Sequence, residues 1–171
     1  EQSWLLFRDV AISRRERADH VVSSAILREG AAWEHQIRRG AAVPTGWVGG
    51  SLLFQAQLAG ARANNLDLHG IQFGASDLMG ADLSGTDCTA CGLLGGHLDG
   101  INLRGSILES AFLAEASMNG ADLSFARLTR AVLRKVDAAD VTFLQSDLTG
   151  ADLTGARLDG STFSQAVLLE T

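Results

Sequence analysis

The chain has 171 residues, of which 46% are hydrophobic, and it carries a formal charge of −6. These values are typical of one globular domain with a buried core, and no run of apolar residues is long enough for a transmembrane helix. The acidic balance disfavours direct binding to nucleic acid, and nineteen glycines with no tyrosine exclude a core built on large rings.

Residues 1–50 form the first predicted unit, an N-terminal α-helical cap followed by a linker. Ser13 and Glu16 are spaced as a capping box, apolar residues recur at helical spacing after them, and Gly40 is expected to end the helix. Because a solenoid exposes an apolar cross-section at its end, we hypothesise that this helix covers the first coil. The alternative is that the segment belongs to a neighbouring domain or to a dimer partner.

Residues 51–171 form the second unit, an unbroken series of twenty-four five-residue repeats that begins SLLFQ, AQLAG, ARANN, LDLHG. The third position is apolar in every repeat from Leu53 to Leu168, whereas the second and fourth positions are mostly polar. A period of five fits neither the 3.6 residues of a helical turn nor the alternation of a strand. The chain is therefore expected to turn a corner every five residues, with the third side chains inside.

Repeats such as ADLSG, ADLTG and INLRG follow the pattern A-(D/N)-L-x-x, and this pattern resembles the pentapeptide repeat family over 121 of the 171 residues. The resemblance implies an all-β fold, a right-handed quadrilateral β-helix with four repeats per coil and the first and third residues pointing inward. Twenty-four repeats would then form about six coils. Equivalent positions would stack twenty residues apart, so that Phe143 and Phe163 form a stacked rung.

Two cysteines, Cys88 and Cys91, lie three residues apart. This spacing alone hints at metal or redox chemistry, but a zinc site needs about four ligands and no second pair follows. In the repeat register both residues face the interior. We therefore expect reduced cysteines that pack as small hydrophobic residues, and neither a disulfide nor a metal site.

The repeat predicts no enzyme, no cofactor and no metal centre. Catalysis needs polar groups that converge in a concave pocket, whereas this pattern gives an aliphatic interior and flat walls. The four histidines are scattered, and the repeated aspartates are explained as outward, solubilising positions. Function is therefore expected on the outer walls.

Two surface features are candidates for that function. Phe112 and Val132 should be neighbours one coil apart, which would form an apolar patch typical of an interface. A basic corner around Arg130 should face an acidic stretch further along the rod and steer a partner. The alternative for both is an ordinary mixed surface. The candidate interaction residues are Leu94, Phe112, Val132, Ile107, Arg127, Arg130, Arg134, Asp77, Asp82 and Asp87.

The favoured function is a non-catalytic protein–protein interaction or scaffold module, one domain of a bacterial secretion-system accessory protein or effector; the bacterial assignment is implied by the family resemblance. The alternative is a DNA mimic that protects DNA gyrase or topoisomerase IV from inhibitors, as members of that family do. A net charge of −7 over residues 51–171 fits this alternative, whereas the basic corner interrupts the acidic track. We expect a protein partner, with a homodimer as a second option, and a cytoplasmic location, with secretion as the alternative.

Overall fold

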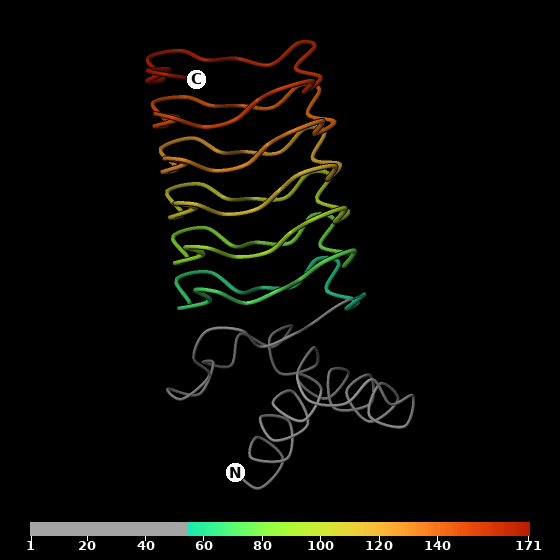
Figure 1. Cartoon of the computed structure of the whole chain (residues 1–171). Helices are drawn as coiled ribbons and strands as arrows, with labels where there is room; N and C mark the ends of the chain where they lie inside the picture. Colours follow the sequence, from blue (N-terminus) through green and yellow to red (C-terminus); the bar gives the residue numbers. More distant parts are fainter. Residues whose placement is uncertain (1–54) are drawn as a thin grey trace, which may run out of the picture.

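A computed structural model describes residues 55–171, which wind into a stack of coils (Figure 1). In each repeat the second residue forms an isolated parallel β-bridge, and the fourth and fifth residues form a turn. The bridges recur every five residues from Gln57 to Val167, and each joins residues twenty apart, such as Asn102 and Asp122. This offset corresponds to four repeats per coil, as the family resemblance implies. The helical cap expected over residues 1–50 lies outside the described residues.

The corners are made by the fifth residue of each repeat. From Gln55 to Glu170 every fifth residue has a positive φ, between 52° and 71°. Glycine adopts this left-handed conformation without a steric penalty, whereas other residues lose about 1 kcal/mol or more. This explains the frequent glycine at the fifth position. It also means that each non-glycine corner is kept at a cost.

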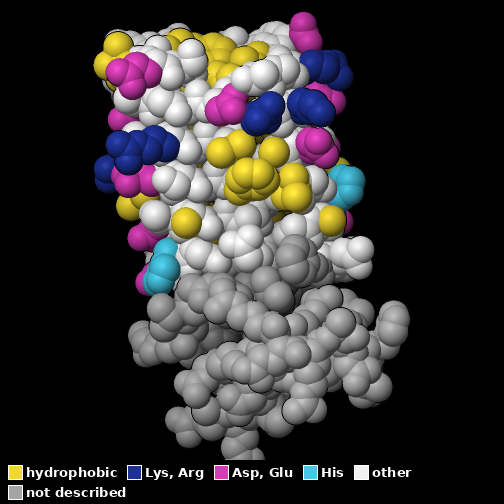
Figure 2. Space-filling model, in the orientation of Figure 1, with side chains coloured by type: hydrophobic (Ala, Val, Ile, Leu, Met, Phe, Trp, Pro, Cys, Tyr) yellow, Lys and Arg dark blue, Asp and Glu magenta, His cyan; other side chains and the backbone are white. Residues whose placement is uncertain are grey.

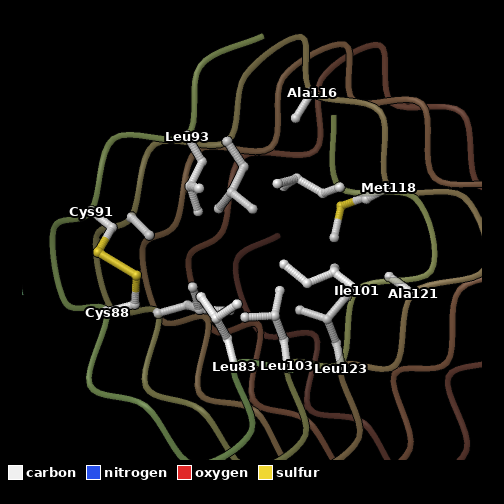
Figure 3. Close-up of a cluster of buried hydrophobic side chains, with 14 of the residues drawn as sticks. Leu83, Cys88, Cys91, Leu93, Ile101, Leu103, Ala116, Met118, Ala121 and Leu123 are labelled. Carbon is white, nitrogen blue, oxygen red and sulfur yellow. A yellow bond between two sulfur atoms is a disulfide. The ribbon is translucent and has the colours of Figure 1, made fainter. Parts of the chain in front are cut away.

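The interior of the stack is filled by the first and third residues. The third residues, mostly leucine, meet along the axis, and the column Leu83, Leu103 and Leu123 is almost completely buried (Figure 3). The first residues beside them are most often alanine, with larger aliphatic residues at a few positions such as Ile71 and Ile101. Phe143 and Phe163 stack with their ring centroids 4.7 Å apart, which confirms the predicted rung. Within residues 55–171 the axis is therefore filled by the side chains of the chain itself.

Cys88 and Cys91 are both buried, as expected, but they form a disulfide (Figure 3). The prediction of reduced cysteines is therefore wrong for this structure. The physical reason lies in the corner: the third residue of one repeat and the first residue of the next both point inward across it. This places the two Cα atoms 5.2 Å apart, within the range that a disulfide spans. The two side chains are therefore both packed in the core and joined by a disulfide.

Four of the five backbone N–H groups in a typical repeat donate to backbone carbonyls, as in the bond of 2.8 Å from Leu103 N to Asp122 O. The N–H of the fourth residue has no backbone acceptor. A side chain at the second position accepts it instead: Asp122 Oδ1 accepts from Ser124 N at 2.8 Å, and Asn102 Oδ1 accepts from Arg104 N at 3.1 Å. Aspartate and asparagine are therefore frequent at the second position because they complete the hydrogen bonding of the turn.

We predict that Asp122→Ala destabilises the fold by about 1 kcal/mol, because the N–H of Ser124 loses its acceptor. Asp122→Asn keeps an accepting oxygen and should cost less than half as much. Urea denaturation followed by circular dichroism measures both. Equal losses in the two variants would instead assign the effect to the carboxylate charge and its pairing with Arg104, which lies 3.9 Å away.

Candidate interaction surface

One wall of the rod carries an apolar patch, and we call it the apolar wall; it consists of residues 71–75, 91–95, 111–115, 131–135 and 151–155. Phe112 and Leu94 are 44% and 47% exposed, and Val132 is half-buried. Phe112 bridges to Val132 in the next coil, which confirms that they are neighbours. Leu94 lies in the coil on the other side, because Leu93 N donates to Phe112 O. Figure 2 shows hydrophobic side chains gathered midway along one face.

Ile107 does not join this patch. It occupies the second position of the adjoining wall, where it is half-buried and bridges to Asp87 on one side and to Arg127 on the other. Its neighbours along the rod are thus a carboxylate and a guanidinium group. The structure therefore separates Ile107 from Phe112 by a corner.

The basic residues Arg127, Arg130 and Arg134 do come together, because residues 127–135 pass from the adjoining wall around one corner onto the apolar wall. Arg127 pairs with Glu109, and the Nε of Arg134 lies 3.6 Å from Asp152. Such exposed pairs contribute little to stability. Arg130 forms no ion pair with any residue in 55–171. One rim of the apolar patch is thus basic, with one unpaired arginine.

The acidic residues Asp77, Asp82 and Asp87 do not form a cluster. They are the second residues of three consecutive repeats, so they lie on three different walls of one coil. Each carboxylate accepts the N–H of the residue two positions later, at 3.0–3.1 Å. Only Asp87 shares a wall with Arg127, with Ile107 between them. The three aspartates are therefore spread over three of the four walls and do not form one acidic stretch.

The apolar wall has unsatisfied backbone donors, which the sequence reasoning missed. The N–H groups of Leu94, Ala114 and Arg134 have no acceptor within residues 55–171, because the second residues of their repeats are glycine, phenylalanine and valine. These donors occupy the same position in successive coils, and the N–H of Gly74 in the preceding coil also has no acceptor among the described residues. The signal in the sequence is the absence of aspartate and asparagine from one position in four successive coils. The N–H groups of Glu109 and Thr129 on the adjoining wall lack an acceptor for the same reason.

A second missed feature is a run of corners without glycine. Five consecutive fifth residues carry side chains despite φ values of 54–62°. Strained backbone of this kind tends to be retained at functional sites. The guanidinium of Arg104 lies over one of these side chains, 4.4 Å from the ring centroid of Phe125. The five corner residues are Phe125, Arg130, Lys135, Asp140 and Gln145.

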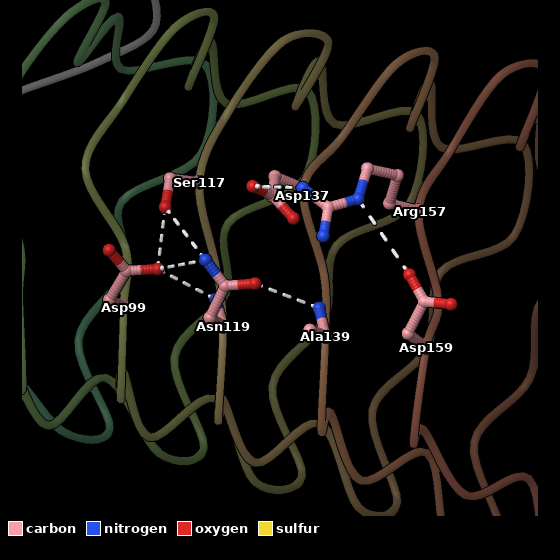
Figure 4. Close-up of polar contacts among 7 residues, drawn as sticks. All are labelled: Asp99, Ser117, Asn119, Asp137, Ala139, Arg157 and Asp159. Carbon is pink, nitrogen blue, oxygen red and sulfur yellow. Dashed lines mark hydrogen bonds and ion pairs between the residues drawn. The ribbon is translucent and has the colours of Figure 1, made fainter.

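A different wall shows the opposite arrangement, with polar side chains bonded to one another along the rod (Figure 4). Asp99 Oδ1 accepts from Ser117 Oγ at 2.5 Å and from Asn119 N at 2.7 Å, and Asn119 Oδ1 accepts from Ala139 N at 2.9 Å. These groups satisfy each other across coils. No group of metal-ligating side chains occurs within residues 55–171.

Hydrogen bonds also change the acidity of carboxylates beside the basic corner. The hydroxyl and the N–H of Thr149 donate to Asp147 at 2.6 and 2.9 Å and, with Arg127 nearby, hold the pKa of Asp147 below its usual range. Hydrogen bonds from Thr154, with a smaller effect from Arg134, lower the pKa of Asp152 in the same way. Both carboxylates are thus kept ionised beside the arginines.

Comparison with known proteins places these features in a family context. Residues 53–89, 97–134 and 126–165 match pentapeptide repeats, in eight copies. No curated protein matches the chain by sequence. Among the described residues, no helix has the length and hydrophobicity needed to cross a membrane.

Three solved structures are similar to this chain. AT2G44920, a pentapeptide repeat protein from the thylakoid lumen of Arabidopsis thaliana, is 25% identical with a TM-score of 0.38; the match covers 60% of this chain and 65% of that protein. HetL from the cyanobacterium Nostoc, involved in regulating heterocyst differentiation, is 23% identical with a TM-score of 0.29; the match covers 70% of this chain and 77% of HetL. Trypsin-treated QnrB1, a plasmid-mediated fluoroquinolone resistance protein, is 20% identical with a TM-score of 0.44; the match covers 67% of this chain and 62% of QnrB1. The chain thus spans less than two thirds of the Arabidopsis protein and of QnrB1.

We predict that Thr149→Val raises the pKa of Asp147 toward its ordinary value of about 3.9, because the variant lacks the hydroxyl donor. Since the native pKa is depressed, ionised Asp147 stabilises the fold above its unfolded pKa, and that contribution is lost as the pH falls through the native value. Thr149→Val should reduce this acid dependence. An NMR titration of the Asp147 carboxyl measures the shift, and an unchanged titration curve would show that the hydroxyl is not responsible.

Proposed function

The chain belongs to the pentapeptide repeat family, whose members form right-handed quadrilateral β-helices, and we propose that it is a non-catalytic protein–protein interaction or scaffold module. The observation that carries the proposal is the contrast between a filled interior and an apolar patch on an outer wall. Leu94 and Phe112 expose nearly half of their surface on a rigid backbone. Exposed apolar patches rimmed by polar residues mark interaction sites in soluble proteins.

The polar residues of the walls support the same proposal. The carboxylates of Asp77, Asp82 and Asp87 are engaged by backbone N–H groups of their own turns. A general acid or base instead needs to lie within hydrogen-bonding reach of a substrate held in a pocket. A partner that binds to a flat wall needs only complementary shape and charge.

We further propose a bacterial host protein, in which this rod is a domain of a secretion-system accessory protein or effector, located in the cytoplasm or exported. The support for the host is the family resemblance. The Cys88–Cys91 disulfide favours export, because disulfides persist in oxidising compartments and are rare in the cytosol. Alkylation of the protein in its native cells distinguishes the two locations: modified cysteines support the cytoplasm, and protected cysteines support export.

The complete rod is proposed to contain about six coils, with residues 1–50 as a helical cap. The support is physical, because the first coil would otherwise expose its apolar cross-section and unpaired backbone. Deletion of residues 1–45 tests the cap. A folded and monodisperse product would remove this part of the proposal.

A second candidate function is protection of a type II topoisomerase by mimicry of DNA. The spread of Asp77, Asp82 and Asp87 over three walls, together with the net charge of −7 over residues 51–171, favours it. The basic residues 127–135 interrupt the acidic surface and weaken it. A supercoiling assay with purified gyrase is decisive, because a chain that is inert at micromolar concentration is not such a mimic.

We predict that Phe112→Asp abolishes partner binding at the apolar wall, because it places a charge in the centre of the patch while leaving the buried core intact. The measurement is photo-crosslinking in the native cells, with a photoreactive amino acid at Leu94 in a chain with or without Phe112→Asp. One defined crosslinked partner is expected, and the substitution should remove it.

Met79→Asp is the matched control, because Met79 is 48% exposed on a different wall. It should leave the crosslink at Leu94 unchanged. The proposal fails if no partner is crosslinked from Leu94, or if Met79→Asp reduces the crosslink as much as Phe112→Asp does. Circular dichroism confirms that both variants are folded.

A further inference from the structure

We propose that the apolar wall binds an acidic amphipathic α-helix of a partner protein, which lies along the axis of the rod. This inference rests on the proposed function as an interaction module and names the chemistry of the partner. Three features of the wall carry it: the apolar patch, the column of unpaired N–H donors beside it and the arginine at its corner.

The apolar patch has the dimensions of one helix face. Leu94, Phe112 and Val132 come from three successive coils, so at a spacing of about 4.8 Å the patch extends roughly 10 Å along the rod. On an α-helix, apolar residues at i, i+4 and i+7 cover about 10.5 Å at 1.5 Å per residue. A single amphipathic helix parallel to the axis can therefore cover all three side chains.

The unpaired donors favour a helix over an extended strand. The N–H groups of Leu94, Ala114 and Arg134 recur once per coil, at about 4.8 Å. Side chains at i and i+3 or i+4 on a helix are about 5–6 Å apart, close to this spacing. Groups on one side of a strand recur only every 6.6–6.8 Å or so, and fall out of register within three coils. Carboxylates on a helix can supply the acceptors that the second residues of this wall lack.

The charges at the edge of the patch select an acidic helix. Arg130 has no ion pair within residues 55–171 and sits at the corner of this wall, although the left-handed backbone there disfavours a side chain. Arg134 and Lys135 lie 3.6 and 3.8 Å from their own carboxylate partners, in exposed pairs that are individually weak. Because Asp152 and Glu115 already offset the charges of Arg134 and Lys135, the uncompensated charge at this wall is the guanidinium of Arg130. A partner carboxylate would pair with it, whereas a basic helix would be repelled by it.

The test uses the full chain and a synthetic probe, a fluorescein-labelled helical peptide of eighteen residues with leucine on one face and glutamate beside it. Its charge-reversed control carries lysine in place of every glutamate. Fluorescence anisotropy should show the acidic peptide binding at least about tenfold more tightly than the basic one. Added salt should weaken the binding.

Two variants locate the binding. Phe112→Asp should weaken it about tenfold or more through the patch. Arg130→Gln should weaken it severalfold through the charge, and this variant keeps the fold because Gln145 and Gln165 occupy the same corner position elsewhere. Met79→Asp is the control and should bind like the unmodified chain.

Four outcomes overturn the inference. The first three are no binding of the acidic peptide at roughly millimolar concentration, equal binding of both peptides, and binding that neither Phe112→Asp nor Arg130→Gln weakens. The fourth is a dimer of the unmodified chain, detected by light scattering, that Phe112→Asp converts to monomers, because a second copy then covers the wall. If a natural partner is crosslinked from Leu94 but the acidic peptide does not bind, the proposed interaction module stands and only the acidic helical partner is rejected. If no partner is crosslinked and the peptide does not bind, both proposals are rejected.

Discussion

The narrow axis is the constraint on which the rest of the structure depends. A coil of four short sides leaves room at its centre for one layer of medium side chains, so the third residue is leucine or phenylalanine and the first is small. The almost complete burial of Leu103 and Ala121 shows how little space remains. In residues 55–171 the axis is thus filled by the side chains of the chain itself. The corner that closes each side also explains the left-handed fifth residue.

Hydrogen bonding then separates turns whose fourth N–H has a side-chain acceptor from turns whose fourth N–H has none. The coil-to-coil bonds leave one N–H per repeat without a backbone acceptor, and an aspartate or asparagine at the second position completes the turn, as Asp122 does. On the wall of Asp99 and Asn119 the accepting side chains come instead from neighbouring coils. At Phe112 and Val132 the acceptor is replaced by an apolar group. The same substitution thus creates a hydrophobic surface and unsatisfied donors beside it, two features that favour contact with another molecule.

Much of this fold can be predicted from the sequence, because a fixed period converts residue number directly into position. With four repeats per coil, which the family resemblance implies, the period places Phe143 on Phe163 and Phe112 beside Val132. The errors arose where chemistry depends on the geometry of the corners between repeats. The corner brings Cys88 and Cys91 within bonding distance, whereas reduced, packed cysteines were expected in place of a disulfide. Asp77 and Asp87 are close in sequence but lie on different walls, because two corners separate them.

The candidate surface was harder to predict than the fold because its decisive features are missing interactions. A period shows which residues point outward, but the unpaired N–H groups of Leu94 and Arg134 become visible only when the acceptor of every other donor is known. The corner residue Arg130 is similar: its significance comes from a backbone conformation that glycine would adopt at lower cost. Outer side chains of this rod contribute little to the core. A corner residue such as Arg130, which has no ion pair within residues 55–171, is therefore better explained by a contact with another molecule than by stability.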